Sequence, residues 1–240
     1  MLSWKEKTLP EQSPALVVYT AIAGDRDTLK SQCGRLTAEA RFVAFVDEPG
    51  AVNTAPPWSL EPFTETHPDP VRTARRCKVL SHSLFPGVEY SLWIDGNVTV
   101  RLWSSLTSLI DQYLDGVDLC VFRHPERRCL FKEAEVCKDK RLDDPGIIDA
   151  QMARYRSEGV PEKLGLVESC VILRRHTPAI ARFNDAWWDE MKNGSRRDQL
   201  SFNYVAHRQE LRYSVFPGHI RGASQLFCRE SHVRPLKTVF

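Results

Sequence analysis

The stretch that decides the fold is Ser91-Leu92-Trp93-Ile94-Asp95-Gly96-Asn97-Val98-Thr99-Val100. An apolar run ends there at an acidic tight turn and resumes with alternating β-branched residues, which is typical of a buried strand that ends in a polar turn. In open α/β sheets, ligands bind in the crevice beyond the carboxyl ends of the strands. Asp95 and the amide of Asn97 are therefore expected to project into this crevice, where they could share one cation or phosphate. An ordinary turn between two strands accounts for the same residues, because Asp-Gly pairs favour such turns.

Oxygen ligands at this turn suggest a divalent cation. A hard ion such as Mg²⁺ is usually held by one or two carboxylates together with a substrate phosphate. Asp95 and Asn97 are therefore the candidate metal ligands of the chain.

Strand and helix signals alternate outward from this stretch. Short apolar runs at 15–20 and 41–47 indicate buried strands, and residues 28–40 can form a helix between them. Five prolines within 51–70 forbid a regular element, so a long loop is expected there. A helix should then span 71–85, with its basic residues largely away from its apolar side.

The same alternation continues through the second half of the chain. A helix near 106–114 and a strand at 118–122 complete four βα-like units, which favours parallel pairing in a doubly wound sheet. The remaining elements expected are a helix at 145–157, a strand at 165–173 and helices at 178–191 and 197–208. Because no repeat, low-complexity tract or clear linker interrupts the pattern, we expect residues 1–240 to form one domain.

Composition narrows the class of protein. The 240 residues are 42% hydrophobic, enough for a sizeable core, and 33 basic against 31 acidic residues leave a net charge of +2. This balance argues against a general nucleic-acid binder. The first residues lack the apolar core of a secretion signal and no apolar run is long enough to span a bilayer, which predicts a soluble, cytoplasmic protein. Seven cysteines without a C-x-x-C pair argue against a disulfide framework or a zinc ribbon, and most are expected to be buried.

Basic residues near the predicted strand ends are candidates for phosphate binding. His124 and Arg127 follow the strand at 118–122, where they would face the same crevice as Asp95. Arg75 and Lys78 lie on the helix that precedes the Asp95 strand. Solvated charge on a loop or a helix face explains all four equally simply.

Acidic residues in the second half are candidates for the chemical step. Glu168 interrupts an otherwise apolar strand, and a carboxylate there costs stability unless it is paired or used. An edge strand with Glu168 facing water is the alternative. Asp198 could cap the helix that it begins, although capping does not account for the neighbouring Gln199. The pair Trp187-Trp188 is interpreted as core rather than as a sugar platform.

These residues together resemble a known family. The matching motifs occur in one order along residues 16–206, and they include Tyr19-Thr20-Ala21-Ile22, Trp93-Ile94-Asp95-Gly96-Asn97, His124-Pro125, Gln151-Met152, Trp187-Trp188 and Arg197-Asp198-Gln199-Leu200. The chain resembles the glycosyltransferase-like domain of the plant MUCI and TOD proteins and their bacterial relatives. The combination is far more specific than any single motif.

The resemblance implies a glycosyltransferase of GT-A type, with a mixed α/β sheet flanked by helices in a single domain. Residues 15–125 would then bind the nucleotide sugar, and residues 126–240 the acceptor glycan. In such enzymes a divalent cation, Mn²⁺ or Mg²⁺, bridges the donor diphosphate to a D-x-D motif. Here Asn97 replaces the second aspartate, so either metal affinity is lowered or the diphosphate depends on Arg and Lys side chains. The pair Asp198-Gln199 is similar to an acidic pair near the acceptor in related transferases.

Roles for the candidate residues follow from the needs of sugar transfer. The departing diphosphate needs charge stabilisation, and the acceptor hydroxyl needs a base or an electrostatic partner. The candidates are Asp95, Asn97, Arg75, Lys78, His124 and Arg127 for the diphosphate, Glu168, Asp198 and Gln199 for the chemical step, and Tyr19, Thr20 and Asp47 for the nucleoside.

Two other functions fit the same residues. A metal-dependent phosphohydrolase or nucleotidyltransferase also uses an aspartate at a strand end. A catalytically silent module that binds a nucleotide or glycan would explain Asn97.

Overall fold

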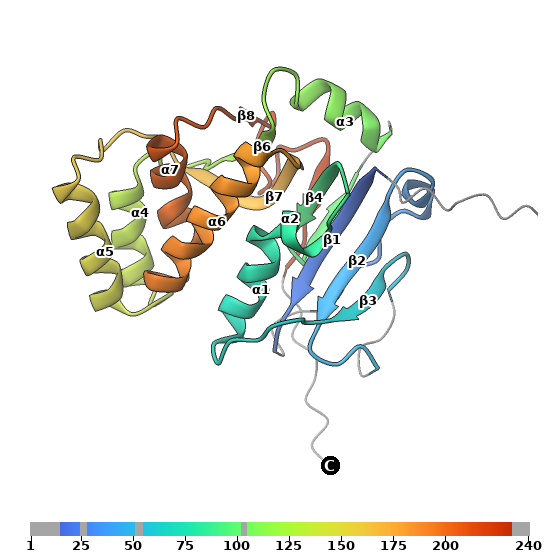
Figure 1. Cartoon of the computed structure of the whole chain (residues 1–240), viewed down its shortest axis with the longest axis horizontal. Coiled ribbons are helices and arrows are strands. Elements are labelled where there is room, and N and C mark those ends of the chain that lie inside the picture. Colours follow the sequence, from blue (N-terminus) through green and yellow to red (C-terminus); the bar gives the residue numbers. More distant parts are fainter. Residues whose placement is uncertain (1–14, 25–27, 51–54, 102–104, 232–240) are drawn as a thin grey trace, which may run out of the picture.

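A seven-stranded mixed sheet forms the centre of the molecule (Figure 1). The computed structural model describes residues 15–24, 28–50, 55–101 and 105–231. The strands follow the order β3-β2-β1-β4-β7-β6-β8 across the sheet, and β5 and β9 form a separate two-stranded sheet. Their bounds are β1 Leu16–Ile22, β2 Arg41–Val46, β3 Ser59–Pro62, β4 Tyr90–Ile94, β5 Val98–Val100, β6 Leu119–Arg123, β7 Val167–Arg175, β8 Ser214–Val215 and β9 Phe227–Arg229.

Strand direction in this sheet is mixed rather than uniformly parallel. Strand β1 pairs in parallel with β2 and β4, whereas β7 runs antiparallel to both β4 and β6. The mixed sheet that the family resemblance implies is confirmed. The four strands of the first half, β1, β2, β4 and β6, run in one direction as the βα pattern predicts, but β7 lies antiparallel between β4 and β6. As a result, the carboxyl ends of β1, β2, β4 and β6 and the start of β7 lie along one edge of the sheet.

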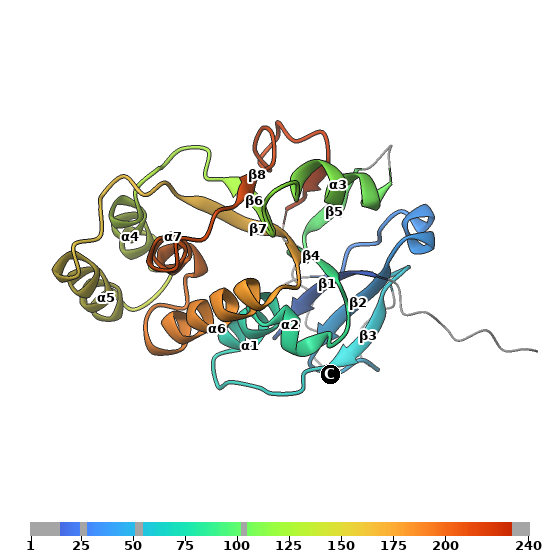
Figure 2. The same ribbon diagram turned by 45° about the horizontal axis from the view of Figure 1, so that its top comes forward.

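Helices cover both faces of the sheet. Figure 2 shows α1, α2 and α6 on one face and α3 on the other, while α4, α5 and α7 extend past the β6–β7 side. The bounds are α1 Pro70–Val79, α2 Ser81–Leu84, α3 Leu106–Tyr113, α4 Leu130–Asp139, α5 Pro145–Ser157, α6 Pro178–Asn193 and α7 Asp198–Arg208. No helix of the described residues is long and apolar enough to cross a membrane.

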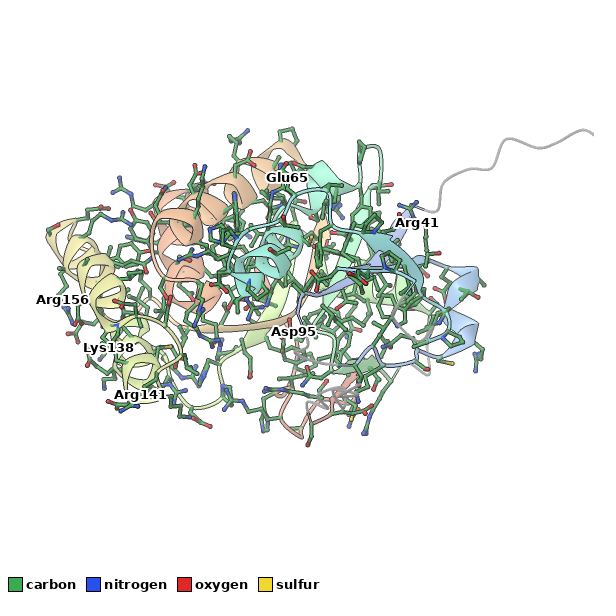
Figure 3. All side chains as sticks on the ribbon, turned by 90° about the horizontal axis from the view of Figure 1, so that it is seen from below. Arg41, Glu65, Asp95, Lys138, Arg141 and Arg156 are labelled. Carbon is green, nitrogen blue, oxygen red and sulfur yellow. The ribbon has the colours of Figure 1, made fainter. Side chains whose placement is uncertain are left out.

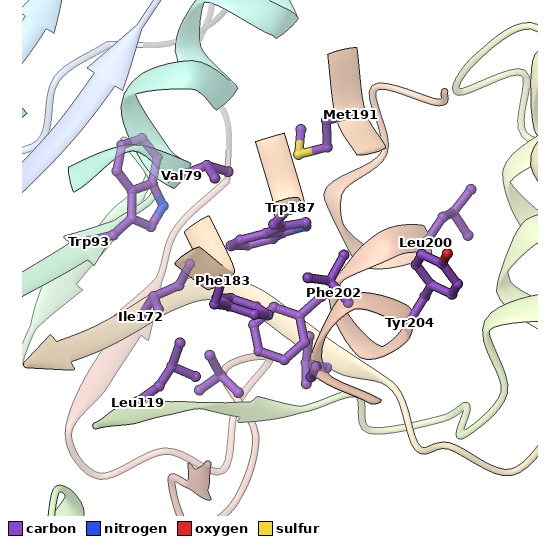
Figure 4. Packing of buried hydrophobic residues seen from close by; sticks show 14 of the residues in the cluster. Val79, Trp93, Leu119, Ile172, Phe183, Trp187, Met191, Leu200, Phe202 and Tyr204 are labelled. Atoms are coloured by element: carbon purple, nitrogen blue, oxygen red, sulfur yellow. The ribbon is translucent and has the colours of Figure 1, made fainter. Parts of the chain in front are cut away.

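A hydrophobic core fills each face. On the α1–α6–α7 face, Phe183, Trp187 and Phe202 pack between α6, α7 and the sheet (Figure 4). The rings of Trp187 and Phe202 meet edge to face with centroids 5.1 Å apart, and Trp187 is fully buried. The interpretation of Trp187 as core is therefore confirmed. On the α3 face the core gathers around Phe122 and Phe216.

Three local expectations are wrong. Residues 28–40 form only a 3-10 turn at Gly34–Ala38, because the Gln32 N–H bonds to the Pro56 carbonyl and holds this segment against a neighbouring loop. The proline-rich segment contains β3, which is tolerated because β3 is an edge strand and Pro62 is its last residue. The helix expected at 71–85 divides at Leu80, whose ψ of 45° is not helical.

The sequence prediction omitted α4 and the short strands β8 and β9. Helix α4 carried a usable signal, because its buried residues Leu130, Ala134 and Cys137 follow helical spacing. Five of the seven cysteines are buried and all seven are free, as expected from their spacing.

Candidate active site

The Asp95 turn lies where β4 ends at the sheet edge. The Asp95 N–H donates to the Cys170 carbonyl (2.8 Å), and the Val98 N–H donates to the Asp95 carbonyl (2.8 Å), which closes the turn. The Trp93 indole donates to Asp95 Oδ1 at 2.8 Å and fixes the carboxylate, whose side chain is 29% exposed. A Cβ on Gly96 would lie 3.1 Å from the Ile22 side chain, so the turn has little room for a larger residue. Figure 3 labels Asp95 near the middle of the molecule, seen from below relative to Figure 1.

Two basic residues of α1 face this carboxylate. Lys78 Nζ lies 3.3 Å from Asp95 Oδ1 and 2.7 Å from Asp198 Oδ2, and the Lys78 side chain is only 1% exposed. Arg75 Nη1 lies 3.3 Å from Asp198 Oδ2 and 3.8 Å from Asp95 Oδ1, and its side chain is 19% exposed. These four residues, Arg75, Lys78, Asp95 and Asp198, are called the ion cluster below. Its two positive and two negative charges balance.

Asp198 is the buried member of the ion cluster. Its Oδ2 also accepts a hydrogen bond from the Ser169 hydroxyl at 2.8 Å. Burial alone would raise the pKa of Asp198, but Arg75 and Lys78, helped by Arg197, hold that pKa well below its usual range. Asp198 is the first residue of α7, after the N-cap Arg197, and its Oδ1 accepts from the Gln199 backbone N–H at 3.2 Å, so the expected bond to the helix start is present beside the ion pairs. The structure places the Asp198 carboxylate beneath the crevice as an anchor for two cations.

Gln199 joins α7 to the start of β7. Its amide donates to the Val167 carbonyl at 3.1 Å and accepts from Arg197 Nη2 at 3.1 Å, and its side chain is nearly buried. Asp198 and Gln199 therefore tie the start of α7 to β7 on either side of Glu168, through Ser169 and Val167. A direct role for either residue in the chemical step stays a prediction.

Glu168 is the second acidic group at the sheet edge. It is 5% exposed on a central strand, so the expectation of an edge strand that faces water is wrong. Its Oε1 accepts from Arg221 Nε at 3.0 Å and from Arg229 Nη1 at 3.4 Å. Its Oε2 is buried and has no hydrogen-bond partner among the described residues.

His124 lies beside Glu168, at the end of β6. The His124 N–H bonds to the Leu166 carbonyl, and Nδ1 accepts from the backbone N–H groups of Glu126 and Arg127. Burial lowers the pKa of His124; Arg127 and Arg221 lower it further, while Glu133 and Glu168 oppose the shift. His124 is therefore largely neutral at pH 7.

Arg127 does not face the crevice as a free cation. Its Nε donates to Glu133 Oε2, and its Nη1 donates to Glu126 Oε2 at 2.9 Å. Both carboxylates neutralise the guanidinium, so phosphate binding by Arg127 would have to displace them. The expected basic loop is instead a paired structural cluster.

The candidate nucleoside residues do not lie together in the way expected. Tyr19 is fully buried in the core, where its hydroxyl donates to the Lys78 carbonyl and accepts from Arg174 Nη1, both at 2.9 Å, so its role in binding a nucleoside is corrected to a structural one. Thr20 is also fully buried, and its Oγ1 has no partner within the described part of the chain. Asp47 is exposed at the end of β2 and accepts from the Gly24 N–H at 2.6 Å.

Asn97 is held by the C-terminal segment. The Asn97 side-chain Nδ2 donates to the Glu230 backbone carbonyl at 2.8 Å, and the Asn97 backbone carbonyl accepts from the Glu230 N–H at 2.8 Å. Asn97 is 1% exposed. Within the described ranges, no group of three or more His, Cys, Asp and Glu side chains could hold a metal ion. Asp95 is partly exposed and stays a candidate metal ligand, whereas the Asn97 amide is buried and does not project into the open as expected.

Comparison with known proteins places the chain in a family. A family model described as "TOD1/MUCI70, glycosyltransferase-like domain" matches residues 62–221. The chain belongs to this family. The matched region contains every member of the ion cluster together with His124 and Glu168.

Two curated relatives come from Arabidopsis thaliana. "Probable hexosyltransferase MUCI70" is 33% identical over 144 residues, which are 56% of this chain and 24% of the relative. "Alkaline ceramidase TOD1" is 26% identical over 137 residues, which are 53% of this chain and 30% of the relative. The match therefore spans less than a third of the length of either relative.

One of the solved structures that match this chain is a glycosyltransferase. It is described as "crystal structure of a glycosyltransferase involved in the glycosylation of the major capsid of PBCV-1", with a TM-score of 0.47 and 14% identity over 92% of this chain and 96% of that one.

Sequence reasoning missed several residues that shape the site. Ser169 and Trp93 lie next to residues that it singled out, and their hydrogen bonds to Asp198 and Asp95 follow from the pleat of β7 and β4. Arg221 and Arg229 stand in a C-terminal segment whose local pattern does not indicate contact with Glu168.

Proposed function

We propose that this chain is a glycosyltransferase that moves a sugar from a nucleoside diphosphate sugar to a hydroxyl group of a glycan-type acceptor. The observation that carries the proposal is the ion cluster at the sheet edge, where the partly open Asp95 and Arg75 lie beside the buried Lys78 and Asp198. Membership of a glycosyltransferase-like family supports the same reaction class. Donor, acceptor and the type of sugar are the parts of this proposal that experiment has to supply.

Arg75 is the residue best placed to contact the donor diphosphate. The Arg75 side chain is 19% exposed, and a guanidinium can donate to several phosphate oxygens; its Nε is buried and has no hydrogen-bond partner among the described residues. A hydrogen-bond donor that is already fixed where negative charge grows on the leaving diphosphate lowers the barrier to sugar transfer. Lys78 is too deeply buried to reach the donor and acts by holding Asp95 and Asp198.

Asp95 alone would repel a diphosphate, so its role needs a positive partner. Asp95 would help to hold a divalent cation, Mn²⁺ or Mg²⁺, whose charge would stabilise the leaving diphosphate. Without the cation, Arg75 would carry this task and Asp95 would serve to orient Arg75. These two arrangements differ in their sensitivity to a chelator.

Glu168 is the group we assign to the acceptor side. Its unpartnered Oε2 can accept a proton from, or a hydrogen bond with, an acceptor hydroxyl, in line with general-base or electrostatic assistance. Burial of an unsatisfied carboxylate oxygen costs stability, which is commonly accepted only where the group has a function. His124, at the end of the neighbouring β6, completes the same side of the crevice.

A transfer assay tests the proposal. The chain is incubated with UDP- and GDP-sugars and a panel of oligosaccharides, with Mn²⁺ or with EDTA. The products are identified by their masses in mass spectrometry. We expect an acceptor that gains one sugar and an equal amount of nucleoside diphosphate. Asp95→Asn should lower the yield at least about tenfold, whereas the matched change Asp111→Asn at an exposed position of α3 should not.

Other products would contradict the proposal. Orthophosphate or pyrophosphate release without sugar transfer would indicate a phosphohydrolase or nucleotidyltransferase. Fatty-acid release from ceramide without transfer would indicate the activity named for TOD1. Nucleotide binding without any turnover would indicate a silent binding module.

A further inference from the structure

The C-terminal segment reaches back to the candidate active site. Strand β9 pairs antiparallel with β5, immediately after the Asp95 turn. Glu230 bonds to Asn97 through both its N–H and its carbonyl. Arg221 and Arg229, from the loop before β9 and from β9 itself, both contact Glu168. One segment therefore contacts both the Asp95 turn, which we assign to the sugar donor, and Glu168, which we assign to the acceptor.

The two arginines bind the same oxygen of Glu168. Arg221 Nε lies 3.0 Å and Arg229 Nη1 lies 3.4 Å from Oε1, while Oε2 has no partner among the residues described. Two cations on one oxygen fix the rotation of the carboxylate and leave the other, buried oxygen without a hydrogen bond among the described residues. If the arginines served only to neutralise Glu168, bidentate pairing with both oxygens would be the more favourable geometry.

Arg221 is itself held on several sides. Its Nη1 donates to Glu126 Oε1 at 2.8 Å, and its Nη2 lies 3.3 Å from His124 Nε2. Its guanidinium thus has a fixed position between Glu168, His124 and Glu126, even though the side chain is 35% exposed. A fixed guanidinium can orient a carboxylate with little loss of rotamer freedom at the moment of reaction.

We propose that Arg221 and Arg229 are positioning residues that hold Glu168 Oε1, so that Glu168 Oε2 is presented to the acceptor hydroxyl. This inference rests on the proposed function. The family match ends at residue 221, so Arg229 lies outside the region by which the family is recognised. The catalytic unit on this account extends to β9.

A double-mutant cycle on the transfer reaction tests the inference. Arg221→Met and Arg229→Met should each lower kcat at least about tenfold, with KM for the donor within about twofold of the parent. In a Glu168→Gln background the same changes should lower kcat by less than about twofold, because the group on which they act is already impaired. Arg212→Met, at an exposed position just before β8, is the matched control and should leave kcat unchanged.

A role confined to folding gives a different result. The arginine substitutions would then lower kcat by the same factor in both backgrounds and reduce the urea midpoint. Arg221→Lys should restore part of kcat, because an ammonium can still donate to Oε1, and equal loss in the Lys and Met variants would overturn the proposal.

Failure of the inference differs from failure of the proposed function. If the parent transfers sugar and both arginine variants do so at the parental rate, only the positioning role is overturned. If the parent transfers no sugar, crystal structures of Arg221→Met and Arg229→Met decide the matter. A Glu168 side chain that is displaced or occupies two conformers would support the positioning role. A Glu168 side chain unchanged from the parent would overturn it.

Discussion

Replacement of Lys78 by methionine should strongly destabilise the fold, although methionine keeps most of the volume of the lysine side chain. Lys78 Nζ lies 2.7 Å from Asp198 Oδ2 and 3.3 Å from Asp95 Oδ1 in a nearly dry site. With an effective dielectric constant near 20, these gross attractions are about 6 and about 5 kcal/mol. Desolvation of Lys78 offsets much of this, and removal of one partner of a buried pair typically costs about 3–5 kcal/mol. We expect a loss in that range, toward its lower end because Arg75 and Ser169 still contact Asp198.

Urea denaturation followed by circular dichroism measures this loss. The midpoint should fall by about 1–3 M, because a loss of about 3 kcal/mol is divided by urea m-values of about 1–3 kcal/mol/M. Lys132→Met, at an exposed position of α4, should change the free energy of unfolding by less than about 0.5 kcal/mol. The double variant Lys78→Met with Asp198→Asn should recover at least about 1 kcal/mol, because it removes the excess negative charge that the loss of Lys78 leaves in the ion cluster. A Lys78→Met protein as stable as the control would refute the account of the ion cluster.

Further predictions concern acid stability, the core and ligand binding. The lowered pKa of Asp198 means that the unfolded chain takes up the proton first, so stability should fall below about pH 4, and Asp198→Asn should flatten this part of the pH profile of urea unfolding. Burial, with Arg174 and His82, lowers the pKa of His176 to about 4, so stability should also fall as the pH drops from 6.5 toward that value, and His176→Gln should remove this component. Trp187→Ala should cost about 3–5 kcal/mol in the same assay, and a loss below about 1 kcal/mol would contradict its place in the core. Asp95→Asn should weaken Mn²⁺-dependent binding of nucleoside diphosphate in calorimetry at least about tenfold with little change in the urea midpoint, and parental affinity would make the motif only a turn.

Elements with complete local signals were predicted closely. Helix α5 occupies Pro145–Ser157 as expected, because Pro145 suits the first turn and Asp144 caps the helix by accepting from the Ile147 N–H. Strand β4 and its acidic turn were equally clear from the change in apolar pattern. The direction of β7 was not predicted, because the local pattern of a strand does not tell parallel from antiparallel pairing. In the structure β7 runs antiparallel to both of its neighbours, β4 and β6.

The sequence predicted which residues lie together at the candidate site better than it predicted how buried each of them is. Asp95 and Glu168 do lie at one edge of the sheet, since strand ends in such a sheet converge there, and Lys78 and Asp198 reach this edge from α1 and α7. Their burial depends on packing between α1, α6 and α7, which no local pattern reveals. For that reason Lys78 was expected to be more open than it is, and Tyr19 was assigned to the ligand rather than to the core.

A crystal structure of the chain with saturating UDP or GDP, in the presence of Mn²⁺, tests the central claim most directly. The account predicts a diphosphate beyond the carboxyl ends of β1 and β4, with a phosphate oxygen about 3 Å from a nitrogen of the Arg75 guanidinium and with Asp95 at the same end of the ligand. A nucleotide bound elsewhere on the molecule, or a folded chain that binds none at saturating concentration, would contradict the assignment of this edge of the sheet as the donor site.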